Sequence, residues 1–535
     1  MCATLVAPLA LVDVPPLLDY PNHLARAYVL ALGQHDAFLS QMYVPHWAIL
    51  PNLGMDLVLP PMLWIMPVHL AGRLLLGVSL LLPVIGAILC SNATFGRLPA
   101  RPLASYWPIA ACLVACNGLF LLGFINFQLG IGLALICAAL WMARREKHPK
   151  STAAIGALFG VVLFFCHLMG LAFFLILLGA YEAERAWTLL RANGTWVLPR
   201  RTGALMTILA QRSAWLLPVV AAPMLLYTLS AFAGADGAID WESPHDKLIR
   251  AAMPLINYDL PLDLFSAGLL AGFLLIGARL HWLEVKPRSV IALAVVALLY
   301  VAAPFGCKGT GYIDARFAVM FGFLLFAGIR PTLPGRAALP VALMVLLLFG
   351  LRTGEVATVW DAHNRDLAEL RDAIAPIPPG SRVLLAQVGT NEAAQGQRIP
   401  ARQFLSDGTR LDSHTPALVL IERHAFWTFL FADPAQQPIR LRPPYRDIAN
   451  ATLGIPDVRL LTAPSPIAAD LATFPLEGRW ACCYDYVLLL EAGARPHFAS
   501  NNLTLLRKSE YASLFRVTPG APVATVTAAQ SSPRL

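Results

Sequence analysis

The chain carries few charged residues for its length. Asp, Glu, Lys and Arg make up only 13% of its 535 residues, whereas about 25% is usual for a soluble domain. Hydrophobic residues account for 57% of the chain, and its mean hydropathy is +0.62. This composition excludes an ordinary soluble protein and predicts a polytopic membrane protein.

The sequence also lacks the cysteine spacings of a disulfide framework or a zinc site. Its nine cysteines are scattered, and most lie in apolar segments, where thiols usually serve as small hydrophobic side chains. The adjacent Cys482 and Cys483 fit packing better than redox chemistry. Residues 1–12 lack the basic start and cleavage site of a signal peptide, so we expect a retained helix. Twelve residues span only about 18 Å of a hydrocarbon core about 30 Å thick, so we expect this helix to be truncated.

The net charge of +8 is not gathered into a patch that would bind nucleic acid. The Lys and Arg residues lie in short clusters between apolar segments, where they mark the cytoplasmic side of a membrane protein. These clusters fall at 97–101, 144–150, 185–201, 286–288 and 330–336. The acidic loop 234–263 is expected on the opposite side, together with the loop that contains Asp19, the loop 305–316 and everything after residue 351.

Apolar segments suited to crossing a membrane recur up to residue 351, and we expect about eleven spanning helices. They are predicted at 1–12, 73–90, 103–122, 127–143, 152–166, 168–181, 214–232, 264–278, 290–304, 317–328 and 337–351.

The composition changes at about residue 353, where a soluble domain is expected to begin. We predict an all-α polytopic membrane domain at 1–352, which includes an outer loop with interfacial helices at 13–72, and a C-terminal soluble α/β domain at 353–518. The tail at 519–535 is rich in Ala, Ser, Thr and Pro and is predicted to be disordered. An amphipathic helix is expected at 361–374 and strands are expected at 382–388, 417–421, 426–431, 486–490 and 503–506.

An ionisable cluster at 19–26 follows the first apolar segment. Asp19, His23 and Arg26 open a stretch whose aromatic and aliphatic residues are interrupted by prolines, which is typical of segments in the membrane interface. If the stretch after Pro21 is helical, His23 and Arg26 lie on one face near Asp19. A carboxylate at a membrane surface is costly and usually functional. Structural roles remain open: Asp19 as a helix cap, His23 as a hydrogen-bonding group, and Arg26 as a partner of Asp19 or of a lipid headgroup.

The position of Asp19 and the arrangement around it resemble the C-fold (GT-C) membrane glycosyltransferases, relatives of protein O-mannosyltransferases and lipid A aminoarabinose transferases. Asp19 matches that family's acidic residue after the first helix, and residues 53–56 stand where relatives carry a loop leading to an interfacial helix. Arg316 and Phe317 match an arginine–aromatic pair of the relatives. Tyr20 stands where many relatives have a second acid, so the resemblance does not support a paired-carboxylate metal site; no cofactor is expected, and a need for a divalent cation stays open.

The resemblance implies inverting transfer of a sugar from a polyprenyl phosphate donor to an acceptor on the periplasmic face of a bacterial inner membrane. Asp19 would be the general base, and the C-terminal domain would be periplasmic. The implied partners are the lipid-linked sugar, membrane lipids and a glycan, lipid or protein acceptor. Lys308 and Arg316 are candidates for stabilising the leaving phosphate, with interface anchoring as the alternative. His167 lies where relatives often have a His, and it either contacts substrate or packs.

Two other functions remain open. A transporter or flippase should show internal repeats and charged or broken helices near the bilayer midplane, whereas the apolar segments here are almost purely aliphatic and no repeat is evident. A noncatalytic envelope-assembly protein would use the C-terminal domain as a binding module. Such a protein would tolerate the loss of Asp19, and the enzyme would not.

Overall fold

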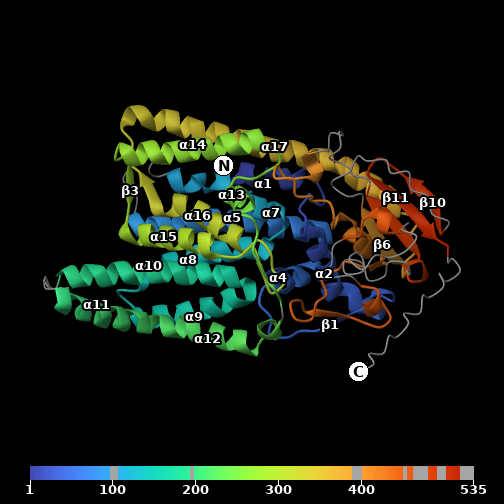
Figure 1. Cartoon of the computed structure of the whole chain (residues 1–535), viewed down its shortest axis with the longest axis horizontal. Coiled ribbons are helices and arrows are strands. Elements are labelled where there is room, and N and C mark those ends of the chain that lie inside the picture. The colour runs from blue at the N-terminus through green and yellow to red at the C-terminus, as the bar shows by residue number, and fades with distance from the viewer. Residues whose placement is uncertain are drawn as a thin grey trace, which may run out of the picture.

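The computed structural model describes residues 1–96, 106–192, 198–235, 237–387, 401–449, 455–461, 480–490 and 502–518. Within these ranges the molecule is a bundle of long helices with a smaller, sheet-containing C-terminal region at one end (Figure 1). The mostly helical membrane part and the sheet in the C-terminal region confirm the coarse prediction of fold class. The predicted tail at 519–535 lies outside the described residues.

Six helical stretches among the described residues are long and apolar enough to cross a membrane. Three shorter or more polar helices lie in the same bundle, so the predicted number of eleven spans is not confirmed. The six are α5 (Val68–Phe95), α8 (Ile125–Arg144), α9 (Pro149–Cys166), Met206–Leu229 from the end of α11 (Leu198–Ser213) through α12 (Leu217–Leu229), α14 (Leu260–Arg279) and α17 (Gly335–Ile374); the other three are α10 (Leu168–Ala192), α15 (Pro287–Ala302) and α16 (Ile313–Gly328).

Two of the predicted spans are not continuous helices. Residues 1–12 form only the short helix α1 (Cys2–Val6) and a 3-10 turn. The described part of 103–122 forms a 3-10 helix and then α7 (Gly118–Leu121). Asn117 explains this break, because its side chain accepts a hydrogen bond from the Phe120 amide (3.0 Å) and donates one to the Val114 carbonyl (2.9 Å). These local bonds replace those of a continuous helix.

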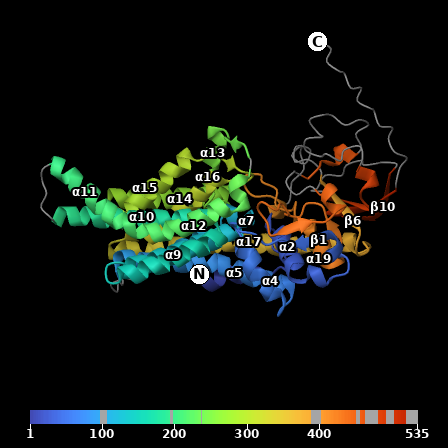
Figure 2. The same cartoon turned by 90° about the horizontal axis from the view of Figure 1, so that it is seen from below.

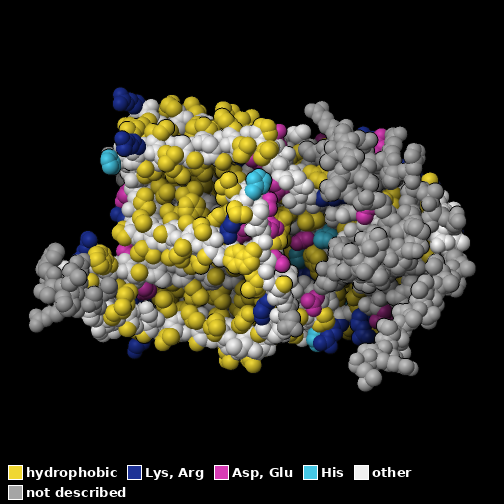
Figure 3. Space-filling view, in the orientation of Figure 1, with side chains coloured by type: hydrophobic (Ala, Val, Ile, Leu, Met, Phe, Trp, Pro, Cys, Tyr) yellow, Lys and Arg dark blue, Asp and Glu magenta, His cyan; other side chains and the backbone are white. Residues whose placement is uncertain are grey.

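The loops of the bundle gather at two opposite ends, as the sequence predicts. At one end β3 (Leu283–Val285) pairs with β5 (Ile329–Pro331), and α11 lies at the same end (Figures 1 and 2). At the other end lie α13 (Pro244–Arg250), α7 and the C-terminal region. Lys and Arg side chains mark the first end in the space-filling view, and the flank between the ends is mainly hydrophobic (Figure 3).

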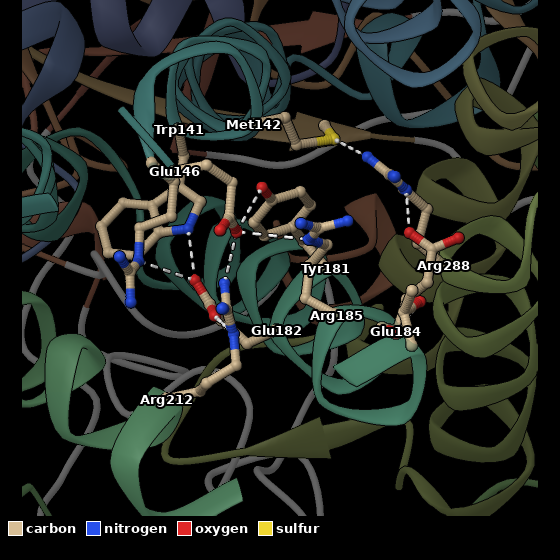
Figure 4. A network of polar contacts seen from close by, with 11 residues as sticks. Trp141, Met142, Glu146, Tyr181, Glu182, Glu184, Arg185, Arg212 and Arg288 are labelled. Carbon is tan, nitrogen blue, oxygen red and sulfur yellow. Dashed lines mark hydrogen bonds and ion pairs between the residues drawn. The ribbon is translucent and has the colours of Figure 1, made fainter. Parts of the chain in front are cut away.

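Ion pairs tie the helices together at the basic end (Figure 4). Glu182 of α10 accepts hydrogen bonds from the Trp141 indole (2.9 Å) and from Arg145 (3.0 Å), and its second oxygen accepts one from Arg212 (2.5 Å). The Glu182 side chain is only 3% exposed. Because each oxygen of this buried carboxylate has a cationic partner, the network holds α8, α10 and α11 together.

Helix α17 runs without a break through the expected boundary at residue 352. Its 40 residues make it about 60 Å long. It contains both the predicted last span, 337–351, and the predicted amphipathic helix, 361–374. The membrane bundle and the C-terminal region are therefore joined by one continuous helix.

The C-terminal sheet has the strand order β10-β11-β9-β6-β7, with β6 parallel to β7 and β9 and the other pairs antiparallel. The structure confirms three predicted strands, at 382–388, 486–490 and 503–506, although residue 388 is not described. The predicted strand 426–431 is only two residues long in the structure. One further strand was not predicted. The strands are β6 (Arg382–Gln387), β7 (Phe426–Trp427), β9 (Tyr486–Leu490), β10 (Leu503–Lys508) and the unpredicted β11 (Ala512–Val517).

The strand predicted at 417–421 is wrong, because these residues begin the helix α19 (Leu418–Arg423). Pro416 occupies the first turn of the 3-10 segment that leads into α19, a position for which proline is preorganised. A short apolar run does not by itself distinguish a strand from a buried helix.

The predicted outer loop, 13–72, packs against the C-terminal region. It contains α2 (Tyr20–Leu32), β1 (Tyr43–Pro45) and α4 (Gly54–Leu63). Strand β1 pairs with β8 (Ile439–Leu441), and the Asn22 amide donates to the Phe429 carbonyl at 2.8 Å. The outer loop and the C-terminal region thus form one layer over the end of the bundle.

A candidate active site between the bundle and the C-terminal region

A cavity of about 540 Å³ lies where the outer loop, the bundle and the C-terminal region meet. Acidic and histidine side chains are visible at this junction in Figure 3. Five of the six predicted site residues line the cavity: Asp19, His23, Arg26, His167 and Arg316. The remaining walls are mostly aromatic or amide side chains, from Phe124, Asn126, Phe127, Phe429, Phe431, Gln436 and Gln437.

A backbone hydrogen bond fixes the position of Asp19, and its side chain makes no hydrogen bond to the helix that follows. Its amide donates to the Leu122 carbonyl at 3.1 Å, so the start of α2 is attached to the end of α7. Gly123 permits this approach, since a Cβ on it would lie 2.7 Å from the Asp19 nitrogen. Although Asp19 is the N-cap residue of α2, its side chain makes no capping hydrogen bond. The structure therefore rules out the helix-cap role.

The carboxylate of Asp19 instead contacts His414 of the C-terminal region. The distance from Asp19 Oδ1 to His414 Nδ1 is 3.1 Å, and the two side chains are 18% and 17% exposed. The His414 ring packs edge-on against Phe431, with ring centres 5.1 Å apart. The sequence prediction missed His414, because no local pattern distinguishes it and it lies 395 residues from Asp19.

Arg26 pairs with Asp56 and not with Asp19. Its guanidinium donates to both carboxylate oxygens of Asp56, at 2.7 and 2.8 Å, and the side chains are 2% and 1% exposed. A second donor contact runs to His23 Nδ1 at 3.0 Å. The alternative in which Arg26 pairs with Asp19 is therefore wrong, and Arg26 joins α2 to α4 at the wall of the cavity that Asp19 also lines.

His23 and His167 are neutral groups at the cavity wall. Burial, together with Arg26 and His414, holds the pKa of His23 well below its usual value. Burial and Arg316 do the same to the pKa of His167. His167 Nδ1 accepts a hydrogen bond from the Met169 amide at 3.0 Å. Each ring therefore uses Nδ1 as an acceptor and carries its proton on Nε2.

In the described part of the cavity wall, Arg316 is a cation without an ion-paired carboxylate. It lies in the first turn of α16, and its guanidinium carbon is 5.0 Å from the centre of the Phe124 ring and 6.0 Å from that of Phe127. Among the described residues no carboxylate lies within ion-pairing distance of it, although the charge of Asp19 acts on it across the cavity, and its buried Nε has no hydrogen-bond partner. An unpaired guanidinium beside aromatic rings is suited to binding an anion.

Lys308, the sixth predicted residue, does not line the cavity. Its ammonium donates to the Ala233 carbonyl at 2.6 Å and lies 5.9 Å from the centre of the Phe232 ring. The three residues after it, 309–311, do line the cavity. Lys308 thus fixes this loop to the end of the segment that follows α12.

Several site residues could not be identified from the sequence. Besides His414, the C-terminal region contributes two phenylalanines, two glutamines and one acid, Asp433, to the cavity. All of them belong to a segment that was predicted as part of a separate domain. In the described part of the chain no group of three or more His, Cys, Asp or Glu side chains is placed to hold a metal ion.

The arrangement is suited to one type of chemistry. A carboxylate paired with an imidazole can accept a proton, and an unpaired guanidinium in the same cavity can stabilise a developing negative charge. The cavity lies between the end of the bundle and the C-terminal region. Comparison of the chain with protein-family models, with curated proteins and with solved structures finds no match.

Proposed function

We propose that the chain is a membrane glycosyltransferase that moves a sugar from a polyprenyl phosphate donor to an acceptor, with inversion. The observation that carries the proposal is that Asp19 and Arg316 line one cavity at the end of a bundle of membrane-length helices. In this proposal that end faces the periplasm and the basic end faces the cytoplasm of a bacterial inner membrane, in keeping with the distribution of Lys and Arg.

The reaction is a single displacement at the anomeric carbon. An oxygen of the acceptor forms a bond to that carbon while the bond to the phosphate oxygen breaks, and the electron pair leaves with the lipid phosphate. Asp19 is the general base that receives the proton of the acceptor hydroxyl. Arg316 lies where the charge of the leaving phosphate develops, and its aromatic surroundings strengthen the attraction by excluding water.

The two neutral histidines and the amides complete the binding surface. With Nδ1 engaged, His23 and His167 present Nε2–H groups that can donate to sugar hydroxyl or phosphate oxygens. Asn126 is held by its own contacts, since it accepts from the Met55 amide at 2.7 Å and donates to the Asn52 carbonyl at 2.5 Å. It serves to shape the cavity wall.

The test is sugar transfer by purified protein in detergent or nanodiscs with a series of polyprenyl phosphate sugars. Asp19→Asn keeps the size of the side chain and should lower turnover by about 10²–10⁴-fold, the usual contribution of a general base. Asp36→Asn is the matched control, because Asp36 is also paired with a histidine, His424, yet does not line the cavity. Equal turnover by wild type and Asp19→Asn would contradict the proposal.

The acceptor is sought by mass spectrometry of envelope glycolipids and glycoproteins from cells with and without the gene. If the protein is a glycosyltransferase, one sugar modification should be absent both from cells without the gene and from cells that carry Asp19→Asn. A transporter or assembly protein predicts that cells carrying Asp19→Asn retain the wild-type pattern.

A further inference from the structure

We propose that Asp19 and His414 act as one proton-accepting unit, in which His414 Nε2 takes the proton and Asp19 holds the imidazole in place. This inference rests on the proposed function and changes one step of it: the proton of the acceptor hydroxyl goes to His414 and not directly to Asp19. It makes the C-terminal region a part of the chemistry and not only a cover for the membrane domain.

The first step of the argument is the tautomer of His414. An ionised carboxylate only accepts hydrogen bonds, so the 3.1 Å contact with Asp19 Oδ1 requires a proton on His414 Nδ1. In the neutral ring the lone pair then lies on Nε2. A carboxylate that accepts from one ring nitrogen fixes the tautomer and stabilises the imidazolium that forms when the other nitrogen is protonated.

The second step is a comparison of the three histidines among the described residues of the cavity wall. His23 Nδ1 accepts from Arg26, and His167 Nδ1 accepts from a backbone amide, so both rings carry their proton on Nε2. These two histidines can donate into the cavity but have no free lone pair. Of the three, His414 alone combines a free lone pair with a carboxylate partner.

The third step is the rigidity of the pair. His414 precedes the 3-10 segment Thr415–Ala417, which leads directly into α19. Its ring lies edge-on against Phe431, and the ring of His23 packs on the same phenylalanine with centres 5.4 Å apart. The side chain is nevertheless 17% exposed and lines the cavity. His414 is therefore held in one orientation and stays accessible to an acceptor.

The proton balance of the reaction is complete within this unit. The acceptor O–H bond breaks as the oxygen bonds to the anomeric carbon, and its proton moves to His414 Nε2. The electron pair of the broken sugar–phosphate bond leaves with the phosphate near Arg316. The imidazolium is compensated by Asp19, and it returns its proton to water when the product leaves.

Two substitutions of His414 separate proton transfer from positioning. In His414→Asn the amide nitrogen replaces Nδ1 and can still donate to Asp19, but nothing replaces Nε2. In His414→Gln the donor to Asp19 is lost as well. If His414 takes the proton, both variants lose about 10²–10⁴-fold in kcat, with little change in KM for the donor. If it only orients Asp19, His414→Asn keeps wild-type kcat, and the proposal is overturned.

The matched control is His424→Asn, in which the same substitution removes another histidine of the C-terminal region that is paired with an acid. His424 contacts Asp36 outside the cavity and has φ 50°, a backbone conformation that Asn tolerates. Its turnover should equal that of wild type. A loss in His424→Asn as large as that in His414→Asn would attribute the effect to general destabilisation of the C-terminal region and overturn the proposal.

A second measurement does not depend on turnover. Diethyl pyrocarbonate acylates the free lone pair of neutral imidazole, and peptide mass spectrometry reads the rate at each histidine of the intact membrane protein. We expect His414 to react faster than His23 and His167, and to react more slowly in Asp19→Asn. The reverse order, or an unchanged rate in Asp19→Asn, overturns the pair. If the wild-type protein transfers no sugar, the proposed function is refuted. The labelling rates would still show whether Asp19 and His414 are paired.

Discussion

Breaking the buried ion pair between Arg26 and Asp56 should strongly destabilise the site. It joins α2 to α4 through two hydrogen bonds, and both side chains are nearly inaccessible, at 2% and 1% exposure. Asp56→Asn keeps the shape of the side chain but leaves the guanidinium without a counter-charge. Removing one partner of a buried pair usually costs about 3–5 kcal/mol.

The assay is urea unfolding of the purified protein in detergent, followed by tryptophan fluorescence. Asp56→Asn and Arg26→Gln should each lower the free energy of unfolding by about 3–5 kcal/mol. The double variant Arg26→Met with Asp56→Leu should lose much less than the sum of the two single variants, because no charge then remains buried without a partner.

A half-exposed pair of the same geometry serves as the control. Arg382 donates to both oxygens of Asp485, but these side chains are 34% and 39% exposed. Asp485→Asn should therefore cost only about 0–1 kcal/mol. The reasoning is refuted if Asp56→Asn is no more destabilising than Asp485→Asn, or if the effects of the two single variants at the buried pair are simply additive.

Two further predictions concern the walls of the cavity. Gly123→Ala should reduce turnover strongly, because an added Cβ would lie only 2.7 Å from the backbone nitrogen of Asp19. Gly96→Ala is the control: Gly96 also has a positive φ, but no heavy atom of the described residues lies within 4 Å of an added Cβ, so turnover should be unchanged. The stability of the protein should fall as the pH drops below about 6.5, since the unfolded chain then binds protons that His23 and His167, whose pKa values are held low, do not bind when folded. For each histidine, the free energy of unfolding changes by at most about 1.4 kcal/mol per pH unit. The melting temperature of the double variant His23→Gln/His167→Gln should therefore depend less on pH than that of wild type.

Much of the membrane part follows from composition, because a run of aliphatic residues has few alternatives to a helix in a bilayer. The segment 103–122 fails this rule since Asn117 satisfies backbone groups locally and ends one helix before the next begins. In the C-terminal region, 417–421 is too short for its period to be recognised. Local pattern therefore identifies elements well only where they are long.

The site was predictable only as far as its residues are close in sequence or lie at helix ends. Asp19, His23, His167 and Arg316 all reach the cavity. The partners of the site residues were not predictable, because tertiary packing determines them. Arg26 of α2 contacts Asp56 of α4, and Asp19 contacts His414, which lies 395 residues away in the sequence.

The continuity of α17 has a consequence for how the two parts of the molecule are oriented. A helix turns by about 100° with each residue, so the number of residues in α17 sets the rotation of one attachment of the C-terminal region, and the pairing of β1 with β8 provides another. A single inserted alanine near residue 354 would turn the C-terminal region about the axis of α17 and move His414 away from Asp19. The length of α17 is therefore one determinant of where His414 lies in the cavity.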